Sequence, residues 1–145
     1  MKLIAWVDGG ARGNPGPAGY GAVVAVAEGS ELARLWSFIG EATNNVAEYE
    51  GLIAALEEAI ALGAADLTIM TDSQLVQRQM TGVYKIKQPH LQKLAARARS
   101  LAETLERFEV RHVRREENAD ADALANRAMD ERSSGRESAD SHAAS

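Results

Sequence analysis

Two short, almost wholly apolar segments, residues 3–8 and 67–72, constrain the fold of this chain most strongly, because each ends in an aspartate. Runs of this length and composition are typical of strands buried at the centre of a sheet. Other segments have the apolar spacing of helices: 44–62, 73–81, 90–106 and 118–131. The alternation of such strands with helices indicates an α/β fold.

Three more segments are expected to be strands: 20–27, 32–39 and 108–113. The first three strands follow one another through short turns, which favours an antiparallel meander. The last two are reached through helices, which favours parallel addition to the same sheet. The sequence therefore predicts a five-stranded mixed β-sheet flanked by α-helices.

The composition is that of one domain of ordinary size. With 145 residues, of which 46% are hydrophobic and 26% charged, the chain can bury a single core. The absence of cysteine excludes disulfide scaffolds, thiolate metal sites and cysteine nucleophiles. No run of 18 apolar residues is present, and Asp8 comes too early for a secretory signal, so we expect a cytoplasmic protein without a membrane span. We expect residues 132–145, which are small and polar, to form a mobile tail after a domain at 1–131.

The net charge of −5 conceals a basic block in the middle of the chain. Residues 81–115 carry nine basic and three acidic side chains, and acids prevail on both sides of this block. Such a pattern fits a solvated helix face and a phosphate-attracting stripe equally well. Beside an acidic centre, the stripe would suit a metal-dependent nuclease.

Asp8 and Asp72 are the first candidates for such a centre. The carboxyl ends of parallel strands meet at one edge of a sheet, where ligands of open α/β sheets bind. We therefore expect the two side chains to lie close together. The alternative for Asp72 is that it only caps the helix that starts at Ser73.

Glu48 is the third candidate, because it shares a helix face with apolar residues. It precedes them by 4, 7, 8 and 11 residues, so it belongs to the packing face that contains Leu52, Ala55, Leu56 and Ala59. A carboxylate on such a face needs a partner or a metal ion, since burying a bare charge is costly. The alternative is a capping box from Asn45 to Glu48.

The last helix offers Asp120 and Asp122, which flank its apolar stripe on opposite sides, so spacing does not choose between them. Asn118 is expected to cap this helix.

Converging carboxylates without cysteine favour the hard cations Mg²⁺ or Mn²⁺. Two unit charges about 4 Å apart repel by roughly 4 kcal/mol at an effective dielectric near 20, so we expect divalent ions, two of them, to hold these acids together.

The assembled residues resemble a known family, prokaryotic type 1 ribonuclease H. Five motifs carry the resemblance in order along residues 1–131: 8–10 (DGG), 13–17 (GNPGP), 43–49 (TNNVAEY), 71–74 (TDSQ) and 121–125 (ADALA). The resemblance implies the ribonuclease H-like fold. It also implies an endoribonuclease that cleaves the RNA strand of RNA/DNA hybrids by two-metal-ion catalysis and leaves 5′-phosphate and 3′-hydroxyl ends.

The same resemblance implies roles for individual residues. The four metal-binding catalytic carboxylates would be Asp8, Glu48, Asp72 and Asp122, which favours Asp122 over Asp120. Contacts to the minor groove of the hybrid would come from Asn14, Asn44, Asn45 and Gln74, with Thr43 on a DNA phosphate. Amides both donate and accept hydrogen bonds, so they suit the 2′-hydroxyl that distinguishes RNA, although asparagine also caps helices and forms turns.

The chain departs from many relatives at three places. The loop before the last helix has no histidine, so Arg115 or Glu116 would have to replace it, and His112 is interpreted as a structural strand residue. No basic protrusion follows the second helix, so Lys85 and Lys87 are expected to bind the hybrid, in a salt-sensitive way. Glu41 stands where many relatives carry an arginine.

Two other hypotheses remain open from the sequence: a non-catalytic hybrid-binding module, and a nuclease of the same fold with another substrate. We expect a monomer without an obligatory protein partner.

Overall fold

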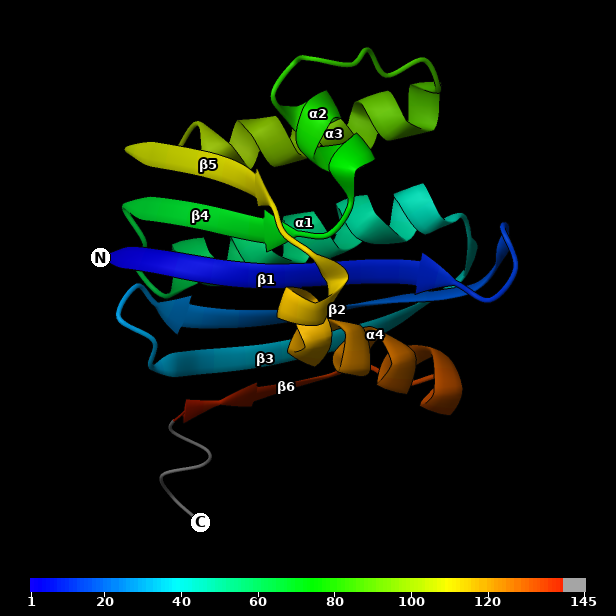
Figure 1. Ribbon diagram of the computed structural model, residues 1–145, viewed down its shortest axis with the longest axis horizontal. Coiled ribbons are helices and arrows are strands. Elements are labelled where there is room, and N and C mark those ends of the chain that lie inside the picture. Colours follow the sequence, from blue (N-terminus) through cyan, green and yellow to red (C-terminus); the bar gives the residue numbers. More distant parts are fainter. Residues whose placement is uncertain (140–145) are drawn as a thin grey trace.

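A six-stranded mixed sheet forms the centre of the molecule in the computed structural model, which describes residues 1–139 (Figure 1). The strands are β1 (Lys2–Ala11), β2 (Gly16–Val26), β3 (Glu31–Ala42), β4 (Asp66–Thr71), β5 (Arg107–His112) and β6 (Gly135–Ser138). Their order across the sheet is β5-β4-β1-β2-β3-β6. The pairs β1–β2 and β2–β3 are antiparallel, whereas β1–β4 and β4–β5 are parallel, as the sequence predicted.

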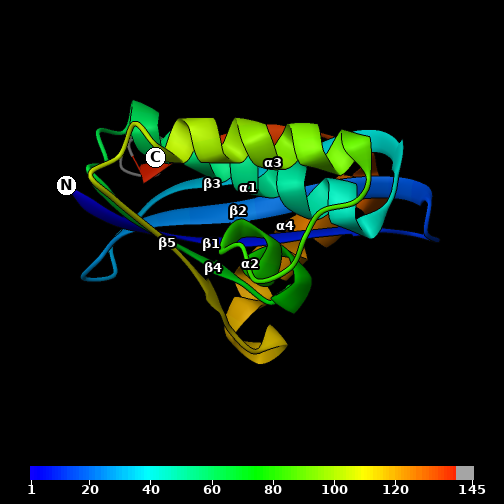
Figure 2. The same ribbon diagram turned by 90° about the horizontal axis from the view of Figure 1, so that it is seen from above.

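Helices cover both faces of this sheet (Figure 2). They are α1 (Asn44–Ala61), α2 (Gln74–Met80), α3 (Pro89–Ala102) and α4 (Ala119–Glu131), with a short 3₁₀ helix, η1 (Arg115–Asn118), before α4. The long helices α1 and α3 lie on one face, and α4 lies on the other. Within residues 1–139, no helix is both long and apolar enough to cross a membrane.

The sheet has six strands rather than the five that we predicted, because part of the expected tail forms β6. This strand pairs antiparallel with β3, from Ala33↔Ser138 to Trp36↔Gly135. A search for apolar periodicity does not find it, because Gly135–Ser138 contains no large apolar side chain; the strand joins the sheet by main-chain pairing and includes an ion pair between Arg136 and Glu58. The remainder of the expected mobile tail, residues 140–145, lies outside the described residues.

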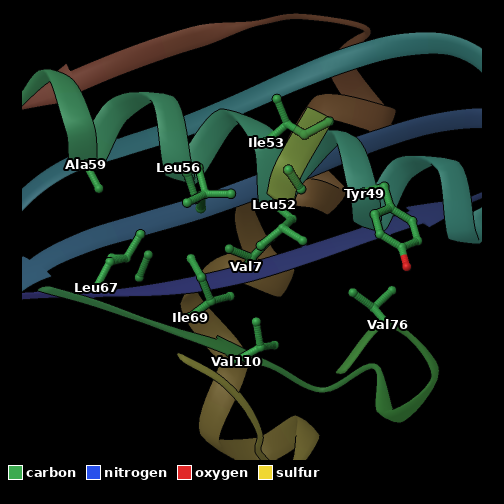
Figure 3. Packing of buried hydrophobic residues seen from close by; sticks show 14 of the residues in the cluster. Val7, Tyr49, Leu52, Ile53, Leu56, Ala59, Leu67, Ile69, Val76 and Val110 are labelled. Atoms are coloured by element: carbon green, nitrogen blue, oxygen red, sulfur yellow. The ribbon is translucent and has the colours of Figure 1, made fainter. Parts of the chain in front are cut away.

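The main core lies between α1 and the central strands (Figure 3). Leu52 and Leu56 of α1 are almost completely buried and pack in one cluster with Leu67 and Ile69 of β4. A buried hydrogen bond joins α1 to α2: the hydroxyl of Tyr49 donates to Oε1 of Gln79 at 2.8 Å. The core thereby fixes α1 and α2, both of which begin near the carboxyl end of β4.

Two strand glycines allow helices to approach the sheet closely at that end. A Cβ atom on Gly9 would lie 2.5 Å from the carbonyl carbon of Ala47 and 2.6 Å from the nitrogen of Glu48. A Cβ atom on Gly21 would lie 2.5 Å from the carbonyl oxygen of Ala121. Only a residue without a side chain fits at either place, so these glycines set how near α1 and α4 come to β1 and β2.

Replacing Gly9 by alanine is therefore expected to lower the free energy of unfolding by about 1–3 kcal/mol, since the new methyl group would push against the backbone of α1. Urea unfolding of Gly9→Ala and wild type measures this difference. Gly10→Ala is the matched control, because its nearest neighbouring atoms would be 3.8 Å away. Equal midpoints for the two variants would contradict the close approach of α1.

Candidate active site

Asp8 and Asp72 lie next to each other at the carboxyl end of the parallel pair β1–β4. The ladder pairs Val7 with Thr71, so each aspartate is the next residue along the chain: Asp8 within β1, and Asp72 directly after the end of β4. Asp72 is not the cap of α2, because that role belongs to Ser73, whose Oγ accepts from the nitrogen of Val76 at 3.1 Å. Both aspartates line a cleft of about 800 Å³, called the acidic cleft below, together with Glu48 and Asp122.

Glu48 reaches this cleft from the first turns of α1. The N-cap of α1 is Thr43, whose Oγ1 accepts from the nitrogen of Val46 at 3.2 Å. Glu48 is thus not in the third helical position that a capping box requires, and that alternative is wrong. Its carboxylate instead lies near the side chain of Ser73, which lowers the pKa of Glu48. Its Oε2 atom is buried and has no hydrogen-bond partner among the described residues.

Asp122 is the acid of α4 that lines the acidic cleft, whereas Asp120 does not. Asp120 is 71% exposed and lies 3.7 Å from Arg34. The difference arises because the two residues leave opposite sides of the apolar stripe that packs α4 on the sheet. Asn118 is the N-cap residue of α4, as expected, but it is buried and its side chain makes no capping hydrogen bond. Its Nδ2 instead donates to the carbonyl of Val7 at 2.9 Å.

The four acids are close enough for their charges to affect one another. Burial, and then the negative charge of Asp72, raise the pKa of Asp8 from 3.8 to about 8, with further contributions from Asp122 and Glu48. Burial also raises the pKa of Glu48 from 4.5 to about 7, against the lowering effect of the Ser73 side chain. Both carboxyl groups therefore hold protons more tightly than they would in water.

The donor chemistry of the acidic cleft fits a hard divalent cation. Carboxylate oxygens are the ligands that Mg²⁺ and Mn²⁺ prefer, and the buried Oε2 atom of Glu48 calls for a positive partner. As placed, no three histidine, aspartate or glutamate side chains of residues 1–139 are close enough to hold an ion. Carboxylates that repel one another need a cation before they close further.

The residues expected to bind substrate lie in three places. Asn44 lines the acidic cleft, its Oδ1 accepting from the nitrogen of Ala11 at 2.7 Å, and Asn14 accepts from the nitrogen of Asn44 at 3.0 Å. Thr43 and Asn45 flank Asn44 at the start of α1, and the exposed Gln74 begins α2. The exposed side chains of Lys85 and Lys87 lie in the segment between α2 and α3.

Sequence reasoning missed several residues that line the acidic cleft. His112 ends β5, as expected of a strand residue, but its side chain is exposed and lines the cleft, which the sequence did not indicate. Arg12 and Asn126 also line it. The position of Asn126, four residues after Asp122 on the same helix, was a signal that could have identified it. Arg115 and Glu116 both line the cleft, and Nη2 of Arg115 lies 3.8 Å from Oδ1 of Asp122.

The fold and the acidic cleft define a class of α/β proteins with carboxylates gathered where parallel strands end. Residues 6–128 match the family described as reverse transcriptase-like. A bifunctional protein of Mycobacterium tuberculosis is 53% identical over 131 residues, which are 90% of this chain and 36% of that protein. The chain therefore spans about a third of the length of that relative.

Two solved structures are similar over nearly their whole length. Ribonuclease H1 of Halobacterium salinarum has a TM-score of 0.88 and 44% identity, covering 90% of this chain and 99% of that one. LC11 ribonuclease H1, solved in complex with an RNA/DNA hybrid, has a TM-score of 0.86 and 43% identity, with the same coverage. The chain belongs to the ribonuclease H family.

The raised pKa of Asp8 predicts how stability depends on pH in the absence of metal. Its folded-state pKa lies above the unfolded value, so folding favours the protonated form, and stability falls as pH rises from about 4 to about 8. Asp8→Asn stays neutral and is expected to melt at a higher temperature than wild type at pH 8 in a chelator, with a smaller difference at pH 5.

Calorimetric melting temperatures at the two pH values measure this effect. Asp120→Asn is the control, because it removes an exposed carboxylate outside the acidic cleft. A difference between Asp8→Asn and wild type that does not grow with pH would contradict the crowding of charge around Asp8.

Proposed function

We propose that this protein is an endoribonuclease that hydrolyses the RNA strand of RNA/DNA hybrids and leaves 5′-phosphate and 3′-hydroxyl ends, with residues 1–131 and the added strand β6 as the catalytic domain. The observation that carries the proposal is the gathering of Asp8, Glu48, Asp72 and Asp122 around one cleft in a member of the ribonuclease H family. The hybrid bound to LC11 ribonuclease H1 supports the choice of substrate.

The four carboxylates are the proposed ligands of two Mg²⁺ or Mn²⁺ ions. Ions held by these side chains would supply the activation of a water nucleophile and the stabilisation of the leaving oxygen. The protein would orient this set through the hydrogen bond from Asn126 to Asp122 and through the Ser73 side chain beside Glu48. Arg115 and Glu116 were the two candidates to replace the absent loop histidine. Arg115 is the one that lies near Asp122, at 3.8 Å, so we assign the role of the histidine to Arg115.

The amides near the acidic cleft are the proposed readers of the RNA strand. The Oδ1 atoms of Asn14 and Asn44 already accept hydrogen bonds from the backbone, so their Nδ2 groups would donate to the 2′-hydroxyl or to base edges. Asn45 and Gln74 would extend this contact. Thr43 uses its oxygen to accept from Val46, and its hydroxyl proton can still bind a DNA phosphate.

The activity is tested with labelled RNA/DNA hybrid, duplex RNA and duplex DNA, each with and without Mg²⁺. We expect cleavage of the hybrid only, and only with the metal. Asp122→Asn is expected to reduce kcat by about 10²- to 10³-fold, because it removes a charge that holds the cations. Asp120→Asn, a neighbour on the same helix, should keep wild-type activity.

Three outcomes would contradict the proposal. Metal-independent binding of the hybrid without any cutting would favour a non-catalytic binding module. Cleavage of duplex RNA in preference to the hybrid would favour another nuclease of the same fold. Equal activity of Asp122→Asn and Asp120→Asn would separate the activity from the acidic cleft.

Lys85 and Lys87 are proposed to bind hybrid phosphates. The double variant Lys85→Gln/Lys87→Gln should raise KM and leave kcat unchanged, and the slope of log affinity against log salt should become shallower by about 1–2. Arg107→Gln is the control for loss of an exposed cation, because Arg107 begins β5 at the end of the sheet opposite the acidic cleft. A salt slope that stays at the wild-type value in the double variant would exclude both lysines from the contact.

A further inference from the structure

The side chain of Asp122 is connected to the loop between β1 and β2 by two consecutive hydrogen bonds. Nδ2 of Asn126 donates to Oδ2 of Asp122 at 3.3 Å. Nη2 of Arg12 donates to Oδ1 of Asn126 at 3.0 Å. Arg12 is also paired with Asp130 at 2.8 Å, on the surface of α4. Arg12, Asn126 and Asp122 all line the acidic cleft, whereas Asp130 does not.

The two bonds fix the orientation of one amide group. A guanidinium group only donates hydrogen bonds, so Arg12 must face the oxygen of Asn126. A carboxylate only accepts them, so Asp122 must face its nitrogen. Both neighbours therefore favour the same orientation of Asn126, and the helix brings Asn126 to Asp122 because the two are four residues apart.

The contacts also divide the two oxygens of Asp122 between different partners. Oδ2 is held by Asn126, while Oδ1 lies 3.8 Å from Arg115 across the cleft. Asp122 is 31% exposed and sits on the first turns of α4, so without Asn126 its carboxylate could rotate into solvent. Oδ2 is thus held by Asn126, while Oδ1 lies near Arg115, and the carboxylate also interacts with the side chain of Asp8 in the cleft.

We propose that Asn126 is a positioning residue for Asp122, and that Arg12 holds Asn126 in the orientation this task needs. The inference rests on the proposed function, because it assigns Asp122 to a cation in the cleft. Arg12 precedes Gly13 and Asn14 in the chain, so the loop proposed to contact the RNA strand also steers a carboxylate of the catalytic centre. Partners of metal-binding side chains commonly act in this way.

Asn126→Ala is the primary test, measured on the full chain with labelled RNA/DNA hybrid. We expect kcat to fall by about tenfold, with KM for the hybrid unchanged and more Mg²⁺ needed for half the maximal rate. Without metal the melting temperature should stay the same or rise, because alanine favours a helix more than asparagine does. With Mg²⁺ added, the rise in melting temperature should be smaller than in wild type, which tests the cation site without reference to activity.

Arg12→Ala separates the two bonds of the connection. We expect a loss of kcat in the same direction but smaller. The double variant Arg12→Ala/Asn126→Ala should be no slower than Asn126→Ala alone, since the residues act in series. Asp130→Asn is the matched control: it removes the other partner of Arg12, leaves the Arg12–Asn126 bond, and should retain wild-type kcat.

Several results would overturn the proposal. One is a wild-type kcat and Mg²⁺ response in Asn126→Ala, and another is an effect on KM alone, which would make these residues substrate contacts. A third is a lower metal-free melting temperature that accounts for the lost rate. If wild type itself cleaves no hybrid, the proposed function fails, and the Mg²⁺-dependent change in melting temperature still decides whether Asn126 positions Asp122.

Discussion

Repulsion among four carboxylates in one cleft is the constraint around which this structure is arranged. Like charges about 4 Å apart repel by roughly 4 kcal/mol at an effective dielectric near 20, and burial adds to that cost. The pKa of Asp8, raised to about 8, records both effects. Besides one another, these acids have polar neighbours that favour their charged form: Ser73 beside Glu48, and Asn126 and Arg115 beside Asp122. They only partly offset the charge, which leaves a site whose chemistry suits a divalent cation.

The sheet brings these charges together by register and by close approach. Parallel pairing of β1 with β4 sets Asp8 beside Asp72 at the same level. Helices on opposite faces supply the other two acids, and the missing side chains of Gly9 and Gly21 let those helices come near enough. The hydrophobic core between α1 and the central strands stabilises this arrangement, and the hydrogen bond from Tyr49 to Gln79 ties α1 to α2. The stability of the core therefore opposes the electrostatic cost of the site.

Local patterns predicted much of this arrangement and failed where a contact is made between distant segments. The apolar runs that end in Asp8 and Asp72 predicted parallel strands, and the position of Glu48 on an apolar helix face predicted its approach to the sheet. The choice between the two acids of α4 was not fixed by their spacing, because it depends on how that helix packs on β2. Strand β6 and the bond between Arg12 and Asn126, 114 residues apart, leave no periodic signal in the sequence.

The most direct measurement is anomalous diffraction from crystals of the wild-type protein soaked in Mn²⁺. The proposed role of cations predicts anomalous density in the acidic cleft within bonding distance of Asp8 and at least one of its three acidic neighbours, with the carboxylates drawn closer together than without metal. Crystals saturated with Mn²⁺ that show no ion among these four side chains would contradict it.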